Sequence, residues 1–327
     1  MTINVVGGAG FIGTRLVAQL RNSDRDVNIV DKNFTKSIRV EMKVADVREL
    51  QVLHSALLPG KIVNLAAEHR DDVSPRSLYD EVNVDGARNI CRCAEELDIR
   101  SIVFTSSVAV YGFAPLGTDE TGRFNPFNDY GRTKLEAEYI YKHWQSKDPE
   151  NRTLVIIRPT VVFGEGNRGN VYNLLNQVAS GKFLMIGDGM NVKSMAYVEN
   201  IAAFIEYALD FSPGVHVYNY VDKPDFNMNS LVSTVYKSLG RSPARIRMPF
   251  AIGMAAGKLF DVVAALTGKK FPVSSIRVRK FCSNTMFTSS IASTGFKPPV
   301  ELVEALERTI KYEFVDDNMN KQTYLTE

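Results

Sequence analysis

The sequence predicts an α/β protein with a doubly wound parallel sheet and a smaller C-terminal α/β lobe. Short, continuous apolar runs alternate with helical patterns through the first half, and a glycine-rich turn follows the first run. Continuous apolar runs are typical of parallel strands that helices cover on both faces. In the second half this alternation gives way to loop-rich segments, which we expect to complete a cleft.

The expected elements divide the chain into three parts. We assign 1–165 to the first domain, with some later segments returning to it, 166–315 to the second lobe, and 316–327 to a frayed tail. Strands are expected at "INVVG", "VNIVD", "KIVNLAA", "SIVFTSS" and "TLVIIRPT", with helical segments such as "TRLVAQLRN" between them. In the second lobe, helical patterns cover 171–180, 198–210, 229–239 and 300–314.

The composition is that of an ordinary globular protein and disfavours several partners. With 39 Lys and Arg against 37 Asp and Glu, the net charge of +2 gives no reason to expect a nucleic-acid partner. Three cysteines form neither a disulfide framework nor a paired metal-ligand pattern, so we expect a reducing compartment and no metal. Because the strand-like "TINVV" stands where a signal peptide would begin, we expect a cytoplasmic protein.

The most apolar later segment spans 248–268, "MPFAIGMAAGKLFDVVAALTG". Lys258 and Asp261 interrupt it, and its mixed composition argues against a membrane span. We expect a helix packed on the second lobe. The alternative is a helix that lies on a membrane surface.

The turn "VVGGAGFIG" indicates a dinucleotide-binding site in a Rossmann domain. Gly7, Gly10 and Gly13 lie between a strand and a helical pattern, where free N–H groups and missing Cβ atoms let a pyrophosphate approach. Asp31 ends the second apolar run, where its carboxylate can accept hydrogen bonds from an adenosine ribose. Because this carboxylate would repel a ribose 2′-phosphate, NAD is favoured. The neighbouring Lys32 and Lys36 leave NADP open as the less favoured cofactor.

A second motif, "DYGRTK", supplies a candidate acid/base. Helical spacing places Tyr130 and Lys134 on one face, where the ammonium would stabilise a phenolate and make the tyrosine a usable acid/base. Upstream, "VFTSSVAVYG" places Thr105, Ser106 and Ser107 at the carboxyl end of an expected strand, where ligands bind in open α/β sheets. These hydroxyls are candidates to hold the substrate oxygen on which Tyr130 acts.

With these motifs the sequence resembles the extended short-chain dehydrogenase/reductase family, in particular its NAD-dependent nucleotide-sugar epimerase/dehydratase branch. The matching segments, in family order, are "GGAGFIG", "NLAAE", "NVDGARNI", "TSSVAVYG", "YGRTK", "RPTVVFGEGNRGN" and "STGFKPPVELVEALERTIKYE". Several independent motifs in this order are specific for the family. They are much less specific for the substrate.

The resemblance implies roles for the matching residues. Tyr130 would be the acid/base, with Lys134 as its partner and as a ligand of the nicotinamide ribose. Ser107 would hold the substrate oxygen, with Ser106 as the second choice. Beyond the glycines and Asp31, the implied cofactor contacts are Phe11, Ile12, Asp46, Val47, Leu65, Ala66, Ala67 and Pro159.

On the substrate side, Asn170 and Val171 match positions that contact a nucleotide diphosphate in the family. Lys193 stands where the family usually has an arginine, so this phosphate contact would be a lysine contact. Arg277 or Arg279 is a candidate clamp for a diphosphate, with a solvated basic turn as the alternative. A homodimer is expected.

Departures from the family pattern bear on the reaction. Dehydratases of the family carry an acidic pair directly after the catalytic hydroxyl, whereas Val108 and Ala109 stand here and cannot transfer a proton. Dehydration is therefore disfavoured. His69, in "AAEHRDD", is either a second acid/base or a cleft-lining residue.

The resulting hypothesis is an NAD-dependent nucleotide-sugar 4-epimerase, acting on a UDP-sugar. Such an enzyme oxidises the sugar to its 4-keto form and reduces it again on the other face. The alternatives are a nucleotide-4-ketosugar reductase, a hydroxysteroid-type dehydrogenase, and a non-catalytic NAD-sensing scaffold. The intact set of Ser107, Tyr130 and Lys134 argues against the scaffold.

Overall fold

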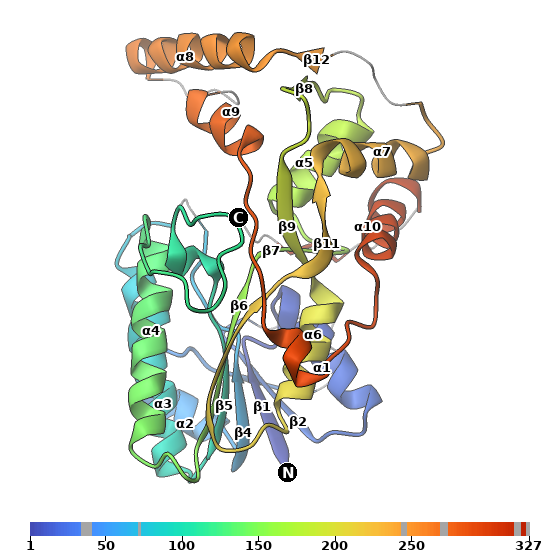
Figure 1. Ribbon diagram of the computed structural model, residues 1–327. Coiled ribbons are helices and arrows are strands. Elements are labelled where there is room, and N and C mark those ends of the chain that lie inside the picture. The colour runs from blue at the N-terminus through green and yellow to red at the C-terminus, as the bar shows by residue number, and fades with distance from the viewer. Residues whose placement is uncertain (34–40, 71–72, 243–246, 269–273, 317–321, 325–327) are drawn as a thin grey trace.

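A seven-stranded parallel sheet, with strand order β10-β6-β5-β4-β1-β2-β3, forms the centre of the computed structural model (Figure 1). The model describes residues 1–33, 41–70, 73–242, 247–268, 274–316 and 322–324. The strands are β1 (Thr2–Val6), β2 (Val27–Asp31), β3 (Met42–Val44), β4 (Gly60–Asn64), β5 (Ser101–Thr105), β6 (Thr153–Pro159) and β10 (Gly214–Tyr220). The chain winds outward from β1 in both directions, which confirms the predicted doubly wound sheet.

Both faces of this sheet are buried, which explains the continuous apolar runs. In β6, Leu154 and Ile156 pack into one core, whereas Val155 and Ile157 pack into the other. The helices on the first face are α2 (Leu50–Ala56), α3 (Gly86–Glu96) and α4 (Asp129–Ser146); those on the second are α1 (Phe11–Asn22) and α6 (Val198–Ala208). Every side chain along β6 is therefore withdrawn from water.

The second lobe stands beyond the carboxyl ends of these strands (Figure 1). It contains the sheet β11-β9-β7, made of β11 (Asp222–Asn227), β9 (Val192–Tyr197) and β7 (Val161–Phe163), and the pair β12 (Arg247–Met248) and β8 (Met185–Ile186). Its helices are α5 (Asn170–Ala179), α7 (Met228–Ser238), α8 (Phe250–Thr267), α9 (Ser275–Cys282) and α10 (Leu302–Ile310). Short helices complete the chain: η1 (Asp80–Asp85), η2 (Val108–Tyr111), η3 (Ile291–Thr294) and η4 (Lys311–Val315).

Two segments from the second half return to the first domain. Helix α6 packs its apolar face with α1 in the second core of the large sheet, and β10 extends that sheet beside β6. The sequence predicts that some later segments return to the first domain, but it does not show which ones. Most of β10 is only partly buried, as is typical of an edge strand, so its apolar signal is weaker than that of β6.

The expectation of a frayed tail over 316–327 is wrong for its described part, 322–324. Tyr324 donates its hydroxyl hydrogen to Thr14 Oγ1 at 2.9 Å and packs its ring near Phe11, with centroids 5.6 Å apart. Its backbone N–H donates to Gly166 O at 2.8 Å. One aromatic side chain in a polar segment is enough to tie this part of the tail to α1.

The expectation for 248–268 is also corrected. The segment forms α8, but only Gly253 and Gly257 of this helix are buried. Rather than packing into the second lobe, α8 projects at the far end of the molecule with α9 beside it (Figure 1). Among the described residues it is the one helix that is long and apolar enough to cross a membrane, judged by length and composition alone.

A buried ion pair joins α4 to the central sheet. Arg158 of β6 donates to both carboxylate oxygens of Glu138, at 2.8 and 2.6 Å, and these side chains are 1% and 0% exposed. Ser106 donates a third hydrogen bond to Glu138, at 2.6 Å. Because a buried charge without its partner is costly, this pair locks α4 against the ends of β5 and β6.

We predict that Glu138→Gln lowers the free energy of unfolding by about 3 to 5 kcal/mol, because Arg158 would stay buried without a counter-charge. The matched control is Glu96→Gln, which breaks the exposed ion pair with Arg92 on α3. The control should cost less than about 1 kcal/mol. Urea unfolding followed by circular dichroism measures both, and equal losses would contradict a structural role for the buried pair.

Candidate active site

A pocket of about 880 Å³ opens at the carboxyl ends of the central strands, between the sheet and the second lobe. Its walls include most of the residues that the sequence analysis proposed for the cofactor and the chemistry. These are Gly7, Gly10, Phe11, Ile12, Gly13, Asp31, Asp46, Val47, Leu65, Ala66, Ala67, Ser106, Ser107, Tyr130, Lys134 and Pro159. Segments far apart in sequence therefore meet where parallel α/β sheets bind ligands.

The glycine-rich turn between β1 and α1 forms one end of the pocket. Gly7 has a φ of +80°, and a Cβ there would lie 2.7 Å from Ala66 N, so a side chain is excluded on both grounds. At Gly10, a Cβ would touch only Gly7 O, at 3.2 Å, and would otherwise point into open space. The turn thus presents bare backbone and the N-terminus of α1 to the pocket, which fits the pyrophosphate of NAD.

Asp31 stands at the edge of this turn, as predicted. Its Oδ2 accepts a hydrogen bond from Ala9 N at 3.0 Å, and its Oδ1 accepts one from Asn33 N at 2.9 Å. These bonds hold the carboxylate at the end of β2, where it can accept from the hydroxyls of a ribose. Lys32 also lines the pocket, whereas Lys36 lies outside the described residues.

Asp46 and Val47 form the next part of the wall. Arg48 donates to the Asp46 carboxylate at 2.8 Å, and this hydrogen bond lowers the pKa of Asp46. Val47 is buried beneath it. An ionised acceptor above an apolar floor is a surface that suits an adenine ring with its exocyclic amine.

We predict that Asp31→Ala weakens NAD binding more than NADP binding, because only the diol of the NAD ribose uses both carboxylate oxygens. We expect roughly a tenfold or greater loss for NAD, the usual cost of removing a charged hydrogen-bond acceptor. Fluorescence titration with both cofactors measures the two affinities. Asp26→Ala, at an exposed carboxylate outside the pocket, is the control. An unchanged preference in Asp31→Ala would refute the ribose assignment.

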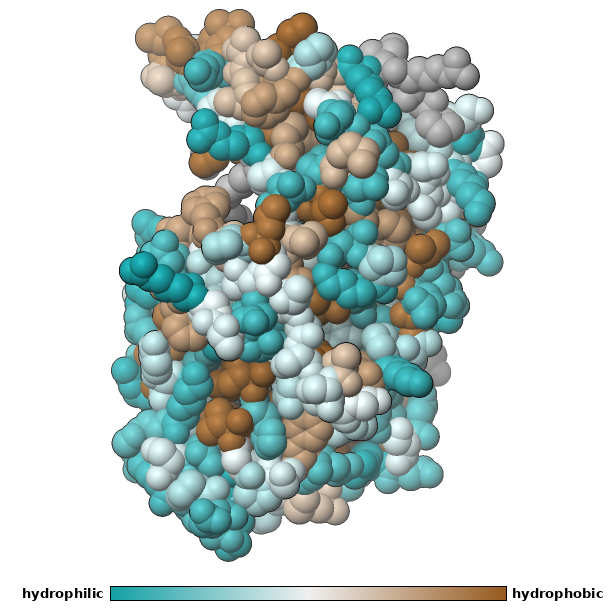
Figure 2. All heavy atoms as spheres, in the orientation of Figure 1, coloured by the Kyte–Doolittle hydropathy of each residue, from teal (hydrophilic) through white to brown (hydrophobic). Residues whose placement is uncertain are grey.

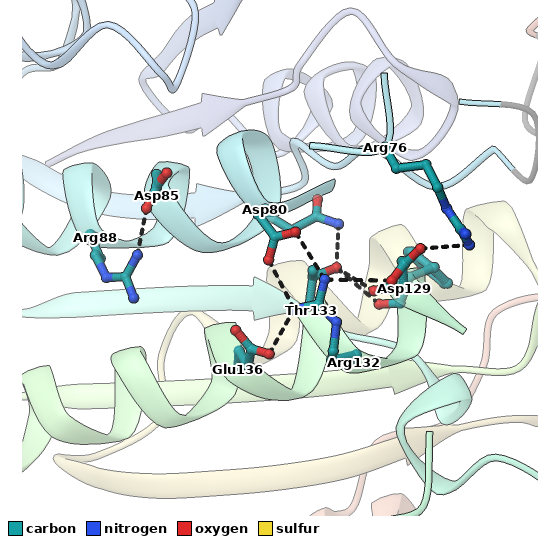
Figure 3. A network of polar contacts seen from close by, with 10 residues as sticks. Arg76, Asp80, Asp85, Arg88, Asp129, Arg132, Thr133 and Glu136 are labelled. Atoms are coloured by element: carbon teal, nitrogen blue, oxygen red, sulfur yellow. Dashed lines mark hydrogen bonds and ion pairs between the residues drawn. The ribbon is translucent and has the colours of Figure 1, made fainter. Parts of the chain in front are cut away.

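Tyr130 lies in the first turn of α4, and several polar contacts fix that turn. Asn128 caps it by accepting from Gly131 N at 2.9 Å. Arg132 donates to Asp80 at 2.8 and 2.9 Å and to Glu136 at 2.8 Å, which ties α4 to η1 (Figure 3). The same hydrogen bonding lowers the pKa of Asp80.

Two further contacts hold this end of α4 (Figure 3). Thr133 Oγ1 accepts from Asn83 at 2.9 Å, and Arg76 approaches Asp129 within 2.7 Å. Helix α4 is therefore anchored on both sides of Tyr130. The phenol is carried by a rigid element, as a group that transfers protons requires.

Lys134 lies one turn further along α4 and is buried. Its Nζ donates to Thr105 O at 2.8 Å and lies 4.7 Å from the centre of the Phe104 ring. Burial lowers the pKa of this lysine to about 7. Its charge thus reaches the pocket from beneath, close to the end of β5.

We predict that the stability of the cofactor-free protein rises with pH through the pKa of Lys134. Below about pH 7 the native state holds the buried charge at full cost, whereas above it the native state loses the proton that the unfolded chain keeps. From about pH 6 to about pH 8, the free energy of unfolding should rise by about 1.4 kcal/mol relative to Lys134→Met.

Urea unfolding at a series of pH values measures this difference. Lys147→Met, at the exposed end of α4, is the control and should leave the pH dependence of the wild type intact. If the wild type and Lys134→Met keep a constant difference across this range, the lysine does not titrate there.

The structure distinguishes the two candidate serines. Ser106 is buried and commits its hydroxyl hydrogen to Glu138, so it belongs to the ion pair beneath the site. Ser107 caps η2 by accepting from Ala109 N at 3.1 Å, which leaves its own hydroxyl hydrogen able to point into the pocket. Val108 and Ala109 also line the pocket, and neither can supply a proton.

The proposed substrate contacts divide. Asn170, the first residue of α5, lines the pocket, whereas Val171 is buried in the core of the second lobe. Lys193 is not among the lining residues: its Nζ donates to Ser283 O at 2.6 Å, and burial lowers its pKa to about 8.

Arg277 and Arg279 are exposed on α9, with buried Val278 between them. Neither lies in the pocket wall, so the structure does not place the expected diphosphate clamp at the pocket.

Several residues of the pocket wall were not predicted from the sequence. Thr285 and Phe287 follow α9, and Thr323 and Tyr324 come from the tail. No local pattern marks such positions, because only the return of distant segments brings them to the site. His69 lines the pocket as a cleft residue, and burial lowers its pKa, so its imidazole is neutral near pH 7.

The comparisons with known proteins agree with this geometry. The model of the NAD dependent epimerase/dehydratase family matches residues 3–220, about two thirds of the chain. This chain belongs to the NAD dependent epimerase/dehydratase family. The predicted family resemblance, the enzyme class and NAD as the cofactor are thereby confirmed. That the glycine turn and Asp31 hold NAD stays a prediction.

Relatives of this family member extend over almost its full length. An N-acetyl-alpha-D-glucosaminyl-diphospho-ditrans,octacis-undecaprenol 4-epimerase from Escherichia coli O157:H7 is 48% identical over 326 residues, covering 99% of this chain and 98% of the relative. A UDP-glucose 4-epimerase from Vibrio cholerae is 27% identical and covers 94% of both chains. These relatives support the predicted epimerase chemistry.

Solved structures show the same fold. The NAD complex of UDP-glucose 4-epimerase from Thermus thermophilus superposes with a TM-score of 0.73 at 20% identity, covering 95% of this chain and 98% of that chain. The complex of MoeE5 with UDP-glucose and NAD gives a TM-score of 0.72 at 22% identity, with the same coverage. At this level of identity the likeness concerns the fold.

Proposed function

We propose that this protein is an NAD-dependent 4-epimerase of a diphosphate-linked sugar. The observation that carries the proposal is the meeting of Ser107, Tyr130 and Lys134 in one pocket with the NAD-binding turn. An epimerase needs one acid/base and one hydride acceptor at a single carbon, and this pocket offers that minimal set. A dehydratase needs another acid/base, for which Val108 and Ala109 are unsuitable.

The roles follow from the contacts. NAD supplies the hydride acceptor and donor. Tyr130 removes the proton of the sugar's 4-hydroxyl and later returns it to the same oxygen, once hydride has been returned to the opposite face of the carbon, while Ser107 holds that oxygen. Lys134, beneath the site, stabilises the phenolate by its charge and fixes the end of β5 through Thr105.

For the substrate, we infer N-acetylhexosamine joined through a diphosphate to a polyprenol. The relative that is 48% identical over nearly the whole chain is an epimerase of such a compound. The pocket wall from the second lobe also lacks, within its described part, the basic side chains that we expected to clamp a nucleotide diphosphate. A UDP-sugar is the second candidate, since a relative at 27% identity is a UDP-glucose 4-epimerase.

A substrate panel tests the proposal. The purified protein is incubated with polyprenyl-diphosphate N-acetylglucosamine, UDP-N-acetylglucosamine and UDP-glucose, and the products are followed by mass spectrometry and sugar analysis. We expect a new configuration with unchanged mass and no net NADH, most rapidly with the lipid-linked sugar. A loss of two hydrogens with net formation of NADH would identify a dehydrogenase, and a loss of water would identify a dehydratase; either would refute the proposal.

We predict that Tyr130→Phe lowers turnover by about two to four powers of ten, the usual effect of losing a general acid/base, while NAD binding persists. Tyr139→Phe, at an exposed tyrosine of the same helix, is the matched control and should retain full activity. If Tyr130→Phe kept normal turnover, another group would have to move the proton, and His69 would be the first residue to replace.

A further inference from the structure

Helix α8 carries an apolar stripe that the described parts of the chain leave uncovered. Its members are Ile252, Leu259, Val262 and Leu266, with exposed fractions of 57%, 65%, 56% and 81%. Their spacing of seven, three and four residues places them along one face of the helix. Figure 2 shows apolar side chains gathered over α8 at this end of the molecule.

The opposite face of α8 is bound to α9. A Cβ at Gly257 would lie 2.8 Å from Ser275 Cα, so the two helices approach as closely as glycine allows. Asp261 accepts a hydrogen bond from Ser275 N at 3.2 Å. A helix that crosses a bilayer faces lipid on all sides, whereas α8 keeps a polar contact with α9 and exposes one apolar side. This geometry suits a helix lying in the plane of a membrane surface.

The charges exposed on the described parts of α8 and α9 are basic. Lys258 is exposed beside the stripe, and Arg277 and Arg279 are exposed on α9. The single acidic residue within the described helices α8 and α9 is Asp261, which is turned toward the α9 backbone. Lysine and arginine close to an apolar helix face are complementary to the headgroups of anionic phospholipids.

We propose that α8 and α9 dock this protein on the surface of an anionic phospholipid bilayer, with the apolar stripe of α8 inserted at the interface. The occupant of this face is thus lipid rather than a second copy of the chain. Charge decides between them, because two copies meeting at this face would bring Lys258, Arg277 and Arg279 together with their like-charged counterparts.

The docking face is joined to the active site by a short segment. Helix α9 ends at Cys282, and Thr285 and Phe287 already line the pocket. Thr285 is held there by hydrogen bonds with Val192 O and Ser194 N, at 3.0 and 2.8 Å. Docking would hold the pocket close to the bilayer surface, where the sugar diphosphate of a polyprenol substrate projects. This consequence rests on the proposed function.

Tryptophan fluorescence gives a direct test. The chain contains one tryptophan, Trp144, which is buried in α4 and provides a constant background. In the variant Leu266→Trp, we expect a blue shift and stronger emission with vesicles of phosphatidylcholine and phosphatidylglycerol, and a much weaker change with phosphatidylcholine alone. Val303→Trp, at an exposed valine of α10, is the control and should not respond.

Vesicle flotation measures the affinity. Val262→Glu should weaken binding of the wild-type chain to the anionic vesicles by about tenfold or more, because a charge replaces inserted apolar surface. Val303→Glu makes the same substitution at a similarly exposed position on another helix and should leave binding unchanged. Equal binding by the two variants, or no shift in Leu266→Trp, would overturn the proposal.

Two further readouts keep the outcomes distinct. A blue shift of Leu266→Trp that appears without vesicles and rises with protein concentration would identify a second copy as the occupant and refute lipid docking. Epimerisation measured with a detergent-free, short-chain diphosphate substrate should be equal in Val262→Glu and the wild type. Absence of that activity in both proteins would contradict the proposed function. The docking proposal would then still be judged by the flotation and fluorescence measurements.

Discussion

The ion pair between Arg158 and Glu138 is the interaction on which the active site depends. It joins β6 to α4 below the pocket, with Ser106 hydrogen bonded to the same carboxylate. Tyr111 extends this network, since its hydroxyl accepts from Arg158 at 2.6 Å and donates to Asn219 at 2.8 Å. Two strands, a helix and the turn that carries Ser107 are thereby held in one arrangement. Proton transfer requires such fixed positions, and a surface network would not hold them.

In the same region, a residue of the proposed mechanism lowers the stability of the fold. Lys134 is buried beside this network, where its charge is costly, yet its ammonium donates to Thr105 O and lies over the Phe104 ring. An apolar residue of similar length would fit the core better, but it could not stabilise a phenolate. The burial of this charge lowers the stability of the fold, and the packing of the surrounding sheet, whose strands are buried on both faces, offsets that loss.

The two ends of the molecule present different surfaces. The glycine-rich turn and Tyr130 line the pocket at the carboxyl end of a tightly packed sheet, whereas the far end of the molecule exposes the apolar stripe of α8 and basic residues of α9. Thr285 and Phe287 connect the two, because they leave α9 and pass directly along the pocket. An enzyme whose substrate is part lipid and part sugar would require both surfaces, and in this chain the short segment that follows α9 joins them.

The sequence by itself determined the parallel sheet, the glycine-rich turn after its first strand, and the placing of Tyr130 and Lys134 one turn apart on a helix. These features depend on local periodicity or on residues within one turn, so a short stretch of chain encodes each of them. Only the tertiary structure decided that Ser106 belongs to a buried ion pair and Ser107 to the pocket, that Arg277 and Arg279 lie away from it, and that α8 is exposed. Each of these outcomes depends on which distant segment covers a side chain. Glu138 of α4 covers Ser106, and the contact of Gly257 with Ser275 decides which face of α8 is exposed.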